Sequence, residues 1–503
     1  DRTDLTSRAV PLEMTPEEFR EVGHRLVDDI AGFLESLPRR PVARDETPAA
    51  VRSLLPSALP ETGADAASLL AETAPLVLDH SALNGHPRFF GYITSSAAPI
   101  GALADLLAAS VNPNVGAWQL SPVASEIEAQ SVRWIGEMLG MPAGTEGLLV
   151  SGGNMANFVC FLAARRAKGG EALREEGLPR DQGRLLVYAS TETHTWIQKA
   201  ADLFGHGTAS IRWIPVGGDL TMDVEALKGQ IEKDRDEGHR PFLLVGNAGT
   251  VSTGAVDPLP RLAALAREHD LWLHVDGAYG ALAVLADEAP ADLRGLAEAN
   301  SVAMDPHKWL YTALEAGCAL VRSPGALRDT FSYAPPYYRF DGEEEDPRLN
   351  YFELGLQNSR GFRALKVWLG LRQAGRAGYA KMIGDDIRLS RELHRRVEAE
   401  PALETLTQQL SISTFRYVPE DLEPGTEAID TYLNELNEEL LRRLQGDGEI
   451  YLSNAVVAGT FALRACIVNF RTTLAAVEVV PGVVARCGEA VDRALRPRTL
   501  AGR

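Results

Sequence analysis

The sequence has few cysteines, no long apolar run and no excess of basic residues. Only four of its 503 residues are cysteines, and none lies in a C-x-x-C spacing. We therefore expect buried free thiols rather than a disulfide framework or a cysteine metal site. The chain opens with charged residues, and no apolar run approaches the roughly 18 residues that span a bilayer. These features predict a cytoplasmic protein without a membrane segment.

Several function classes lack their sequence signals. The formal net charge is −19 and the basic residues are scattered, which does not favour a nucleic-acid partner. The sequence contains no G-x-S-x-G, H-E-x-x-H, G-x-x-x-x-G-K-[ST] or G-x-G-x-x-G pattern, so hydrolase, zinc, P-loop and dinucleotide sites are not indicated. The length and the hydrophobic fraction of 45% are typical of a globular chain with two or three domains.

The first 85 residues are predicted to form helices that are too few to have a hydrophobic core of their own. Thr15 and Glu18 form a capping box ahead of the amphipathic run 19–37. Prolines close this run, and a second helical pattern follows over 66–78. We expect an N-terminal helical segment over 1–85.

Residues 86–375 alternate short apolar runs with helical stretches. This alternation predicts a mainly parallel sheet covered on both faces, with ligands at the carboxyl ends of its strands. The predicted strands are 147–151, 185–188, 242–246, 271–276 and 301–305.

Two further regions follow. The stretch 332–350 contains two prolines and the acidic run 341–346, which predicts a long mobile loop of the kind that often acts as a lid. Residues 376–503 combine amphipathic helices at 383–400 and 425–446 with apolar runs at 411–417 and 460–470. This pattern predicts a small α+β domain.

Lys308 follows the predicted strand 301–305 and comes directly after His307. A lysine at such a strand end can point toward the ligand edge of the sheet. Its amine can condense with a carbonyl once its ammonium is partly desolvated or repelled. The alternative is an ordinary surface lysine.

Asp276 ends the apolar strand that begins at Leu271. A carboxylate in such a place needs a cationic partner, and the protonated ring nitrogen of pyridoxal 5′-phosphate (PLP) is one. Gly277 and Ala278 are small enough for a flat ring to lie over the backbone. A metal ligand or a helix-capping aspartate is the alternative.

Polar groups follow two other strands and one further loop. The run 151–157 closes a strand with two glycines and opens a helix, whose N-terminus could hold a phosphate. His194 follows the strand 185–188, and Thr250 ends the run 246–250. An imidazole there could stack on a planar ring, although glycine turns and lone histidines are commonly structural.

These segments resemble the group II PLP-dependent decarboxylases, and among them the aromatic L-amino-acid decarboxylases. The resemblance rests on 276–279, 307–309 and 151–157, and it extends from about residue 15 to beyond 470. It implies PLP fold type I (aspartate aminotransferase-like). It also implies an obligate homodimer that exchanges its N-terminal helices and has its active site at the interface.

The resemblance also implies roles for single residues. Lys308 would be the Schiff-base lysine, Asp276 the partner of the ring nitrogen and His194 the stacking imidazole. The remaining cofactor contacts would be Gly153, Asn154 and His307 at the phosphate, Thr250 near the ring hydroxyl and Ala278 under the ring.

Tyr337 falls on the catalytic loop tyrosine of this family, with Tyr338 and Tyr351 as rival candidates. It would protonate the α-carbon once the loop closes. Relatives that release an aldehyde commonly carry phenylalanine there. Tyr337 therefore favours plain decarboxylation over the alternative, an aromatic aldehyde synthase.

The substrate pocket is expected to include Tyr92, Ile93 and Thr94, together with Gly116, where relatives with catecholic substrates carry a bulky aromatic residue. The pocket would then be wide and suit an aromatic amino acid. A decarboxylase of glutamate or histidine is the alternative.

Overall fold

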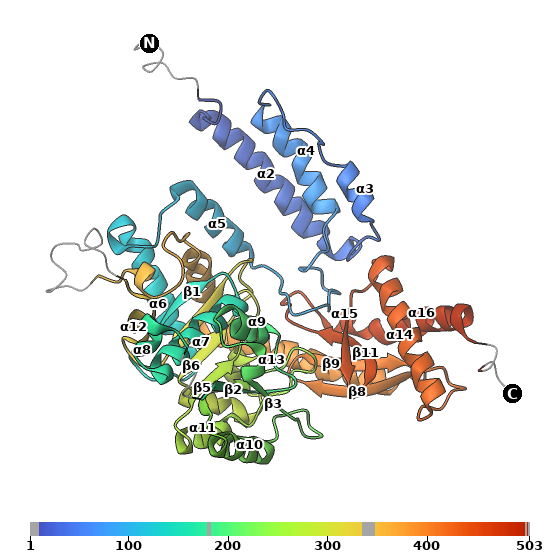
Figure 1. Cartoon of the computed structure of the whole chain (residues 1–503). Coiled ribbons are helices and arrows are strands. Elements are labelled where there is room, and N and C mark those ends of the chain that lie inside the picture. The colour runs from blue at the N-terminus through green and yellow to red at the C-terminus, as the bar shows by residue number, and fades with distance from the viewer. Residues whose placement is uncertain (1–9, 179–182, 334–347, 498–499, 501–503) are drawn as a thin grey trace, which may run out of the picture.

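The computed structural model describes the whole chain except residues 1–9, 179–182, 334–347, 498–499 and 501–503. In chain order it contains a group of helices, a large domain around a seven-stranded sheet, and a small domain around a four-stranded sheet (Figure 1). The predicted fold class, α/β with an N-terminal helical segment and a small C-terminal α+β domain, is confirmed.

The N-terminal helices pack on one another but have no core of their own. They are α2 (Pro16–Ser36), α3 (Pro48–Ser53) and α4 (Ala66–Asp79). The predicted capping box starts α2, because the Thr15 side chain accepts from the Glu18 N–H and the Glu18 carboxylate accepts from the Thr15 N–H. Neither α2 nor α4 contains a buried residue.

The large domain follows from Pro99 onward. Its helices are α5 (Pro99–Val111), α6 (Pro122–Met138), α7 (Gly153–Gly169), α8 (Ala172–Glu176), α9 (Trp196–Leu203), α10 (Val224–Asp236), α11 (Leu259–Glu268) and α12 (Ala326–Phe331). Its strands are β1 (Glu146–Val150), β2 (Leu185–Ser190), β3 (Ile211–Ile214), β4 (Arg240–Asn247), β5 (Trp272–Asp276), β6 (Ser301–Met304) and β7 (Gly317–Val321).

The seven strands form one mixed sheet in the order β1-β7-β6-β5-β4-β2-β3. Six strands run in one direction and β7 runs against them. All residues of β2, β5 and β6 are buried, as expected for strands covered on both faces. The carboxyl ends of β1, β2, β4, β5 and β6 therefore meet at one edge of the sheet.

Helices cover both faces of this sheet and create a separate core on each. Helix α7 lies across β4, β5, β6 and β7 on one face, and α6, α10 and α11 pack on the other. The longest helix among the described residues, α13 (Ala364–Glu398), is broken at Gly375, where φ is 65°. The domain boundary that the sequence predicts at 375 stays a prediction.

The small domain has an antiparallel sheet of order β10-β11-β9-β8. Its elements are β8 (Leu403–Gln409), β9 (Ile412–Tyr417), α14 (Glu427–Asp447), β10 (Ser453–Val457), β11 (Thr460–Cys466), α15 (Leu474–Glu478) and α16 (Val480–Leu495). Residues 89–90, which the sequence assigns to the large domain, are hydrogen-bonded to this sheet region. The Phe90 N–H donates to the Tyr451 carbonyl, and the Phe90 carbonyl accepts from the Cys466 N–H.

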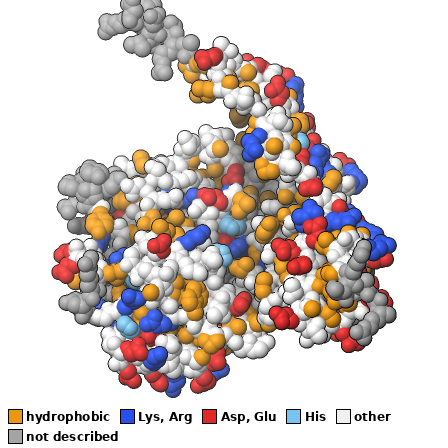
Figure 2. Space-filling view, turned by 45° about the vertical axis from the view of Figure 1, so that its right-hand side comes forward, with side chains coloured by type: hydrophobic (Ala, Val, Ile, Leu, Met, Phe, Trp, Pro, Cys, Tyr) orange, Lys and Arg blue, Asp and Glu red, His pale blue; other side chains and the backbone are white. Residues whose placement is uncertain are grey.

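The N-terminal helices extend from the body as an arm with many hydrophobic side chains (Figures 1 and 2). Exposed large hydrophobic residues of α2, α4 and α5 are Phe19, Val27, Ile30, Leu69, Leu70, Val77, Leu103, Leu106, Leu107 and Val111. All four cysteines are buried free thiols, as predicted. Among the described residues, no helix is both long and apolar enough to cross a membrane.

Candidate active site

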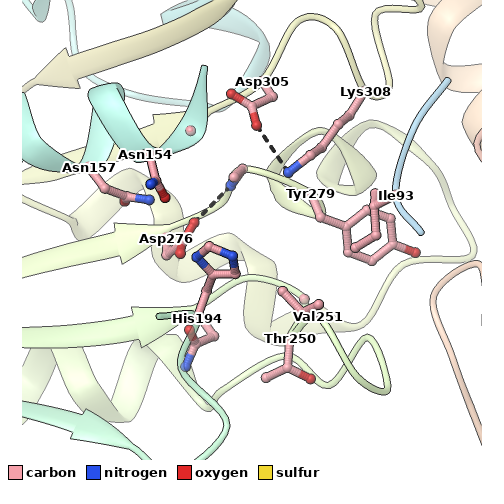
Figure 3. Close-up of a pocket in the computed structure, with 14 residues that line it drawn as sticks. Ile93, Asn154, Asn157, His194, Thr250, Val251, Asp276, Tyr279, Asp305 and Lys308 are labelled. Atoms are coloured by element: carbon pink, nitrogen blue, oxygen red, sulfur yellow. Dashed lines mark hydrogen bonds and ion pairs between the residues drawn. The ribbon is translucent and has the colours of Figure 1, made fainter. Parts of the chain in front are cut away.

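A cavity with about 500 Å³ of empty space, partly open to solvent, lies at the shared strand edge (Figure 3). Eight of the residues predicted for the site line it: Ile93, Gly153, Asn154, His194, Thr250, Asp276, Ala278 and Lys308. Six further lining residues have no predicted role: Asn157, Asn247, Gly249, Val251, Tyr279 and Asp305. The strand ends thus bring together residues that are far apart in the sequence.

Asp276 is the last residue of β5, and its carboxylate is buried at 9% exposure. Its Oδ2 accepts from the Trp196 indole Nε1 at 2.7 Å, and its Oδ1 accepts from the Ala278 N–H at 3.2 Å. Within the described part of the chain, no lysine or arginine forms an ion pair with Asp276. A buried carboxylate with two neutral donors and no cation can accept a positively charged ligand atom.

His194 follows β2, and its ring stands beside Asp276 at the cavity (Figure 3). Its Nδ1 accepts from the Trp196 N–H at 3.2 Å. Burial lowers the pKa of His194, outweighing the attraction of the nearby Asp276 charge. The ring is therefore neutral at neutral pH and presents a flat face.

Lys308 lies in the turn after β6, on the opposite wall from His194 (Figure 3). Its Nζ forms an ion pair with Asp305 Oδ2 at 3.0 Å. The turn is closed by the Lys308 N–H, which donates to the Asp305 carbonyl. The strand end and this turn together direct the lysine amine into the cavity.

The N-terminus of α7 forms a third wall. A Cβ added to Gly153 would lie 2.8 Å from Asp305 Oδ2 and 3.1 Å from Ala278 Cβ, so a larger residue would fill the space beside the helix end. The first N–H groups of a helix have no acceptor within it and attract anions. Gly153 and Asn154 therefore present an anion-binding edge to the cavity.

A buried layer behind the cavity holds these residues in place. Asn157, one turn along α7, accepts from His274 Nε2 at 2.7 Å, and His274 Nδ1 lies 2.9 Å from the Ser301 hydroxyl. The Trp196 ring packs edge-on against His274. Sequence reasoning missed Trp196, although its place two residues after His194 could have suggested it.

A second supporting group lies behind Lys308. The Trp309 indole and the Tyr311 hydroxyl both donate to the buried Asp386 carboxylate on α13, at 3.0 and 2.8 Å. Tyr279 of the cavity wall stacks on Trp309 at 4.7 Å between ring centroids. These contacts fix the turn that presents Lys308.

Four predicted residues do not line the cavity of the single chain: Tyr92, Thr94, Gly116 and His307. His307 lies just behind it, since its Cε1 would be 3.3 Å from a Cβ on Gly152. Tyr92 is 55% exposed. Tyr337 and its rival Tyr338 fall outside the described residues, and the other rival, Tyr351, is buried beside Arg360.

Comparison with known proteins decides what kind of site this is. The model of the pyridoxal-dependent decarboxylase conserved domain matches residues 48–418, more than half of the chain. The chain belongs to this family of PLP-dependent decarboxylases.

Relatives of this decarboxylase-family chain match over nearly their whole length. The aromatic-L-amino-acid decarboxylase of Bacillus atrophaeus is 35% identical over 463 residues, covering 92% of this chain and 94% of that protein. A phenylacetaldehyde synthase of a Rosa hybrid cultivar is 30% identical over 476 residues, covering 93% of each. The crystal structure of Oryza sativa TDC with PLP and tryptamine has a TM-score of 0.87 and 27% identity, covering 96% of this chain and 99% of that one.

The residues of the cavity fit PLP. The cofactor has a ring nitrogen that can be protonated, a phosphate and an aldehyde. The cavity has a buried carboxylate without a cationic partner, a glycine at a helix N-terminus and a lysine amine. The predicted cofactor is confirmed, and this chain is a PLP-dependent enzyme of the amino-acid decarboxylase family.

Proposed function

We propose that this enzyme removes the α-carboxylate of an aromatic L-amino acid and releases the corresponding amine and carbon dioxide. The observation that carries the proposal is the pairing of Asp276, a buried carboxylate without a cationic partner, with the Lys308 amine on the opposite wall of one cavity. The printed function of the Bacillus atrophaeus relative supports an aromatic substrate. The hydrophobic side chains of Ile93, Val251 and Tyr279 on the cavity wall agree with it.

PLP bound in this cavity supplies an electron sink for the pair left when a bond at the α-carbon breaks. Lys308 would hold the cofactor covalently until the substrate amine takes its place. Asp276, kept in position by the Trp196 indole, would pair with the ring nitrogen and keep it protonated. His194, neutral because burial lowers its pKa, would stack on the ring.

The other cofactor contacts would lie around these three residues. Gly153 and Asn154 would bind the phosphate through the free N–H groups at the start of α7, with His307 behind them. Ala278 would pack under the ring. Thr250 would lie near the ring hydroxyl. The Thr250 hydroxyl is held in place, because it lies 3.1 Å from the Thr253 hydroxyl and accepts from the Ala255 N–H at 3.1 Å.

Tyr337 is proposed as the residue that returns a proton to the α-carbon. The proposal rests on its place in the sequence motif, since the residue lies outside the described ranges. A tyrosine hydroxyl can deliver that proton in a site from which water is excluded. This role favours the amine as product.

A homodimer is also proposed. The exposed hydrophobic side chains along α2, α4 and α5 would bury themselves against a second copy, which fits an arm that has no core of its own. Tyr92, Thr94 and Gly116 would then contribute to the substrate pocket at the interface. The cytoplasmic location stays a prediction.

The second candidate function is an aromatic aldehyde synthase, because the Rosa phenylacetaldehyde synthase matches this chain over 93% of its length. Both reactions use the same cofactor and lysine. They differ in whether the product keeps its nitrogen.

The experiment is a competition with product analysis. The purified enzyme receives tryptophan, tyrosine, phenylalanine, glutamate and histidine at equal concentration, and mass spectrometry identifies the products. We expect aromatic amines with carbon dioxide and without hydrogen peroxide. Aldehyde, ammonia and peroxide would establish the second candidate, and amines from glutamate or histidine alone would contradict the aromatic substrate.

A further inference from the structure

Asp305 is a buried acidic residue on the wall where the cofactor phosphate is expected. Its side chain is 3% exposed, and its Oδ2 lies 3.0 Å from Lys308 Nζ and 3.5 Å from His307 Nε2. Its Oδ1 is buried without a hydrogen-bond partner among the described residues. A carboxylate in this place would repel a phosphate at the start of α7.

Two charge states conflict with the proposed function. Lys308 must lose a proton before its nitrogen can attack an aldehyde, yet its Nζ lies in an ion pair with Asp305 at 3.0 Å. Asp305 must lose its negative charge, because its Oδ2 lies beside Gly153 at the helix end. A single proton transfer between the two groups resolves both problems.

We infer that Asp305 takes the proton from Lys308 when a phosphate enters the anion-binding edge at α7. The N–H bond at Lys308 Nζ breaks and an O–H bond forms at Asp305 Oδ2, so the pair goes from oppositely charged to neutral. The acid can then donate a hydrogen bond to a phosphate oxygen. The freed lone pair of Nζ attacks the aldehyde carbon, and condensation releases one water.

The other groups around Asp305 leave it as the nearest base to Lys308. On its own turn it faces Lys308 and His307, and burial lowers the pKa of His307. Among the described residues, the titratable groups that approach from other elements are Cys318 on β7, His194 after β2 and Asp276 at the end of β5. Asp276 already accepts two hydrogen bonds, from Trp196 and Ala278.

The inference rests on the proposed function and makes Asp305 a link between phosphate binding and lysine reactivity. The test uses the full chain freed of PLP and then given pyridoxal, which lacks the phosphate, with or without inorganic phosphate. The readout is the rate at which the visible absorbance of the lysine–aldehyde adduct appears. In the wild type we expect inorganic phosphate to speed this step about tenfold.

Asp305→Asn removes the proton acceptor and keeps the shape of the side chain. This variant should react with pyridoxal about tenfold faster than the wild type without phosphate, because Lys308 loses the carboxylate with which it forms an ion pair. Added phosphate should then bring no further gain. Asp386→Asn is the matched control, since that buried carboxylate supports the same turn through Trp309 but does not line the cavity; it should keep the phosphate effect.

The outcomes separate this inference from the proposed function. If the wild type forms no adduct even with PLP, the proposed role of Lys308 fails. If it forms the adduct with PLP but phosphate does not speed the reaction of pyridoxal, or if Asp305→Asn keeps the acceleration, only the role of Asp305 is overturned. The wild-type measurement needs no variant, so poor folding of Asp305→Asn would not prevent the test.

Discussion

The two sides of the cavity differ in how they are built. The proposed cofactor side consists of Asp276, His194, Gly153, Asp305 and Lys308, which lie at or just after the ends of strands of one sheet and line the cavity. Of the proposed substrate side, Tyr92, Thr94 and Gly116 do not line the cavity that the described residues form, and Tyr337 lies outside those residues. We infer that cofactor chemistry is a property of the large domain, whereas substrate choice depends on the catalytic loop and on a second copy.

The variant with the largest expected effect removes the lysine of the cofactor side. Lys308→Ala should remove the visible adduct with PLP and reduce amine formation to background, because no other amine reaches the cavity among the described residues. The matched control is Lys366→Ala, at a buried lysine that pairs with Asp105 at 3.1 Å and lies outside the cavity. Persistence of the adduct in Lys308→Ala would refute the assignment.

A second variant keeps the shape of the cofactor side and removes one charge. Asp276→Asn should lower kcat/KM by about 10²–10³-fold and weaken PLP binding, because the ring nitrogen loses its anionic partner. Absorbance titration with PLP and steady-state rates would measure both. The control is Asp234→Asn on α10, a buried carboxylate that accepts a hydrogen bond from the Tyr188 hydroxyl of β2. This variant should leave PLP affinity unchanged. Normal kinetics in Asp276→Asn would mean that the ring nitrogen has another partner.

A third variant changes one residue of the N-terminal arm and leaves the cofactor side unchanged. Val27→Glu places a charge among the exposed hydrophobic residues of α2 and should raise the dimer dissociation constant by about 10²–10³-fold, since an unpaired buried charge costs about 3–5 kcal/mol. At dilutions that give monomers, we expect the PLP absorbance to persist while turnover falls.

Sedimentation with absorbance detection would measure the assembly state and the bound PLP together. Asp28→Asn, at a neighbouring exposed position, serves as the control. Loss of PLP along with the dimer would show that both sides of the cavity depend on the second copy.

The smallest effect concerns the layer behind the cofactor side. Burial lowers the pKa of His274 from 6.5 to about 4. Its neutral form therefore stabilises the fold fully above pH 6.5, and this contribution is lost as the pH falls through 4. Protonation of His274 should account for roughly 3 kcal/mol of the decrease in the free energy of unfolding between pH 7 and pH 4. The His274→Gln variant should lack this part of the decrease. Denaturant titrations at the two pH values would measure it, and an unchanged difference would contradict the burial argument.

Much of the cofactor side could be predicted from the sequence, because each of its residues follows a strand that the local pattern reveals. The apolar run ending at Asp276 is such a case, and the glycines before α7 are another. The ion pair of Asp305 with Lys308 depends on the turn between them, so no periodicity reveals it. Strands β3 and β7 were also missed; β3 is a four-residue edge strand whose Trp213 is 40% exposed.

The substrate side could be predicted only as a resemblance. Tyr92 and Gly116 do not line the cavity that the described residues form, and Tyr337 lies in a stretch whose acidic and proline-rich composition carries no periodic signal. Local sequence patterns report which residues share a strand or a helix face. They do not report how a loop or a second copy completes a pocket.

The most direct test of the central claim is to locate the cofactor on the chain. The purified enzyme with PLP is reduced with borohydride, digested and analysed by peptide mass spectrometry. We expect a single pyridoxyl group, on the peptide that contains Lys308. A pyridoxyl group on Lys366, on Lys199 or on no lysine at all would contradict it.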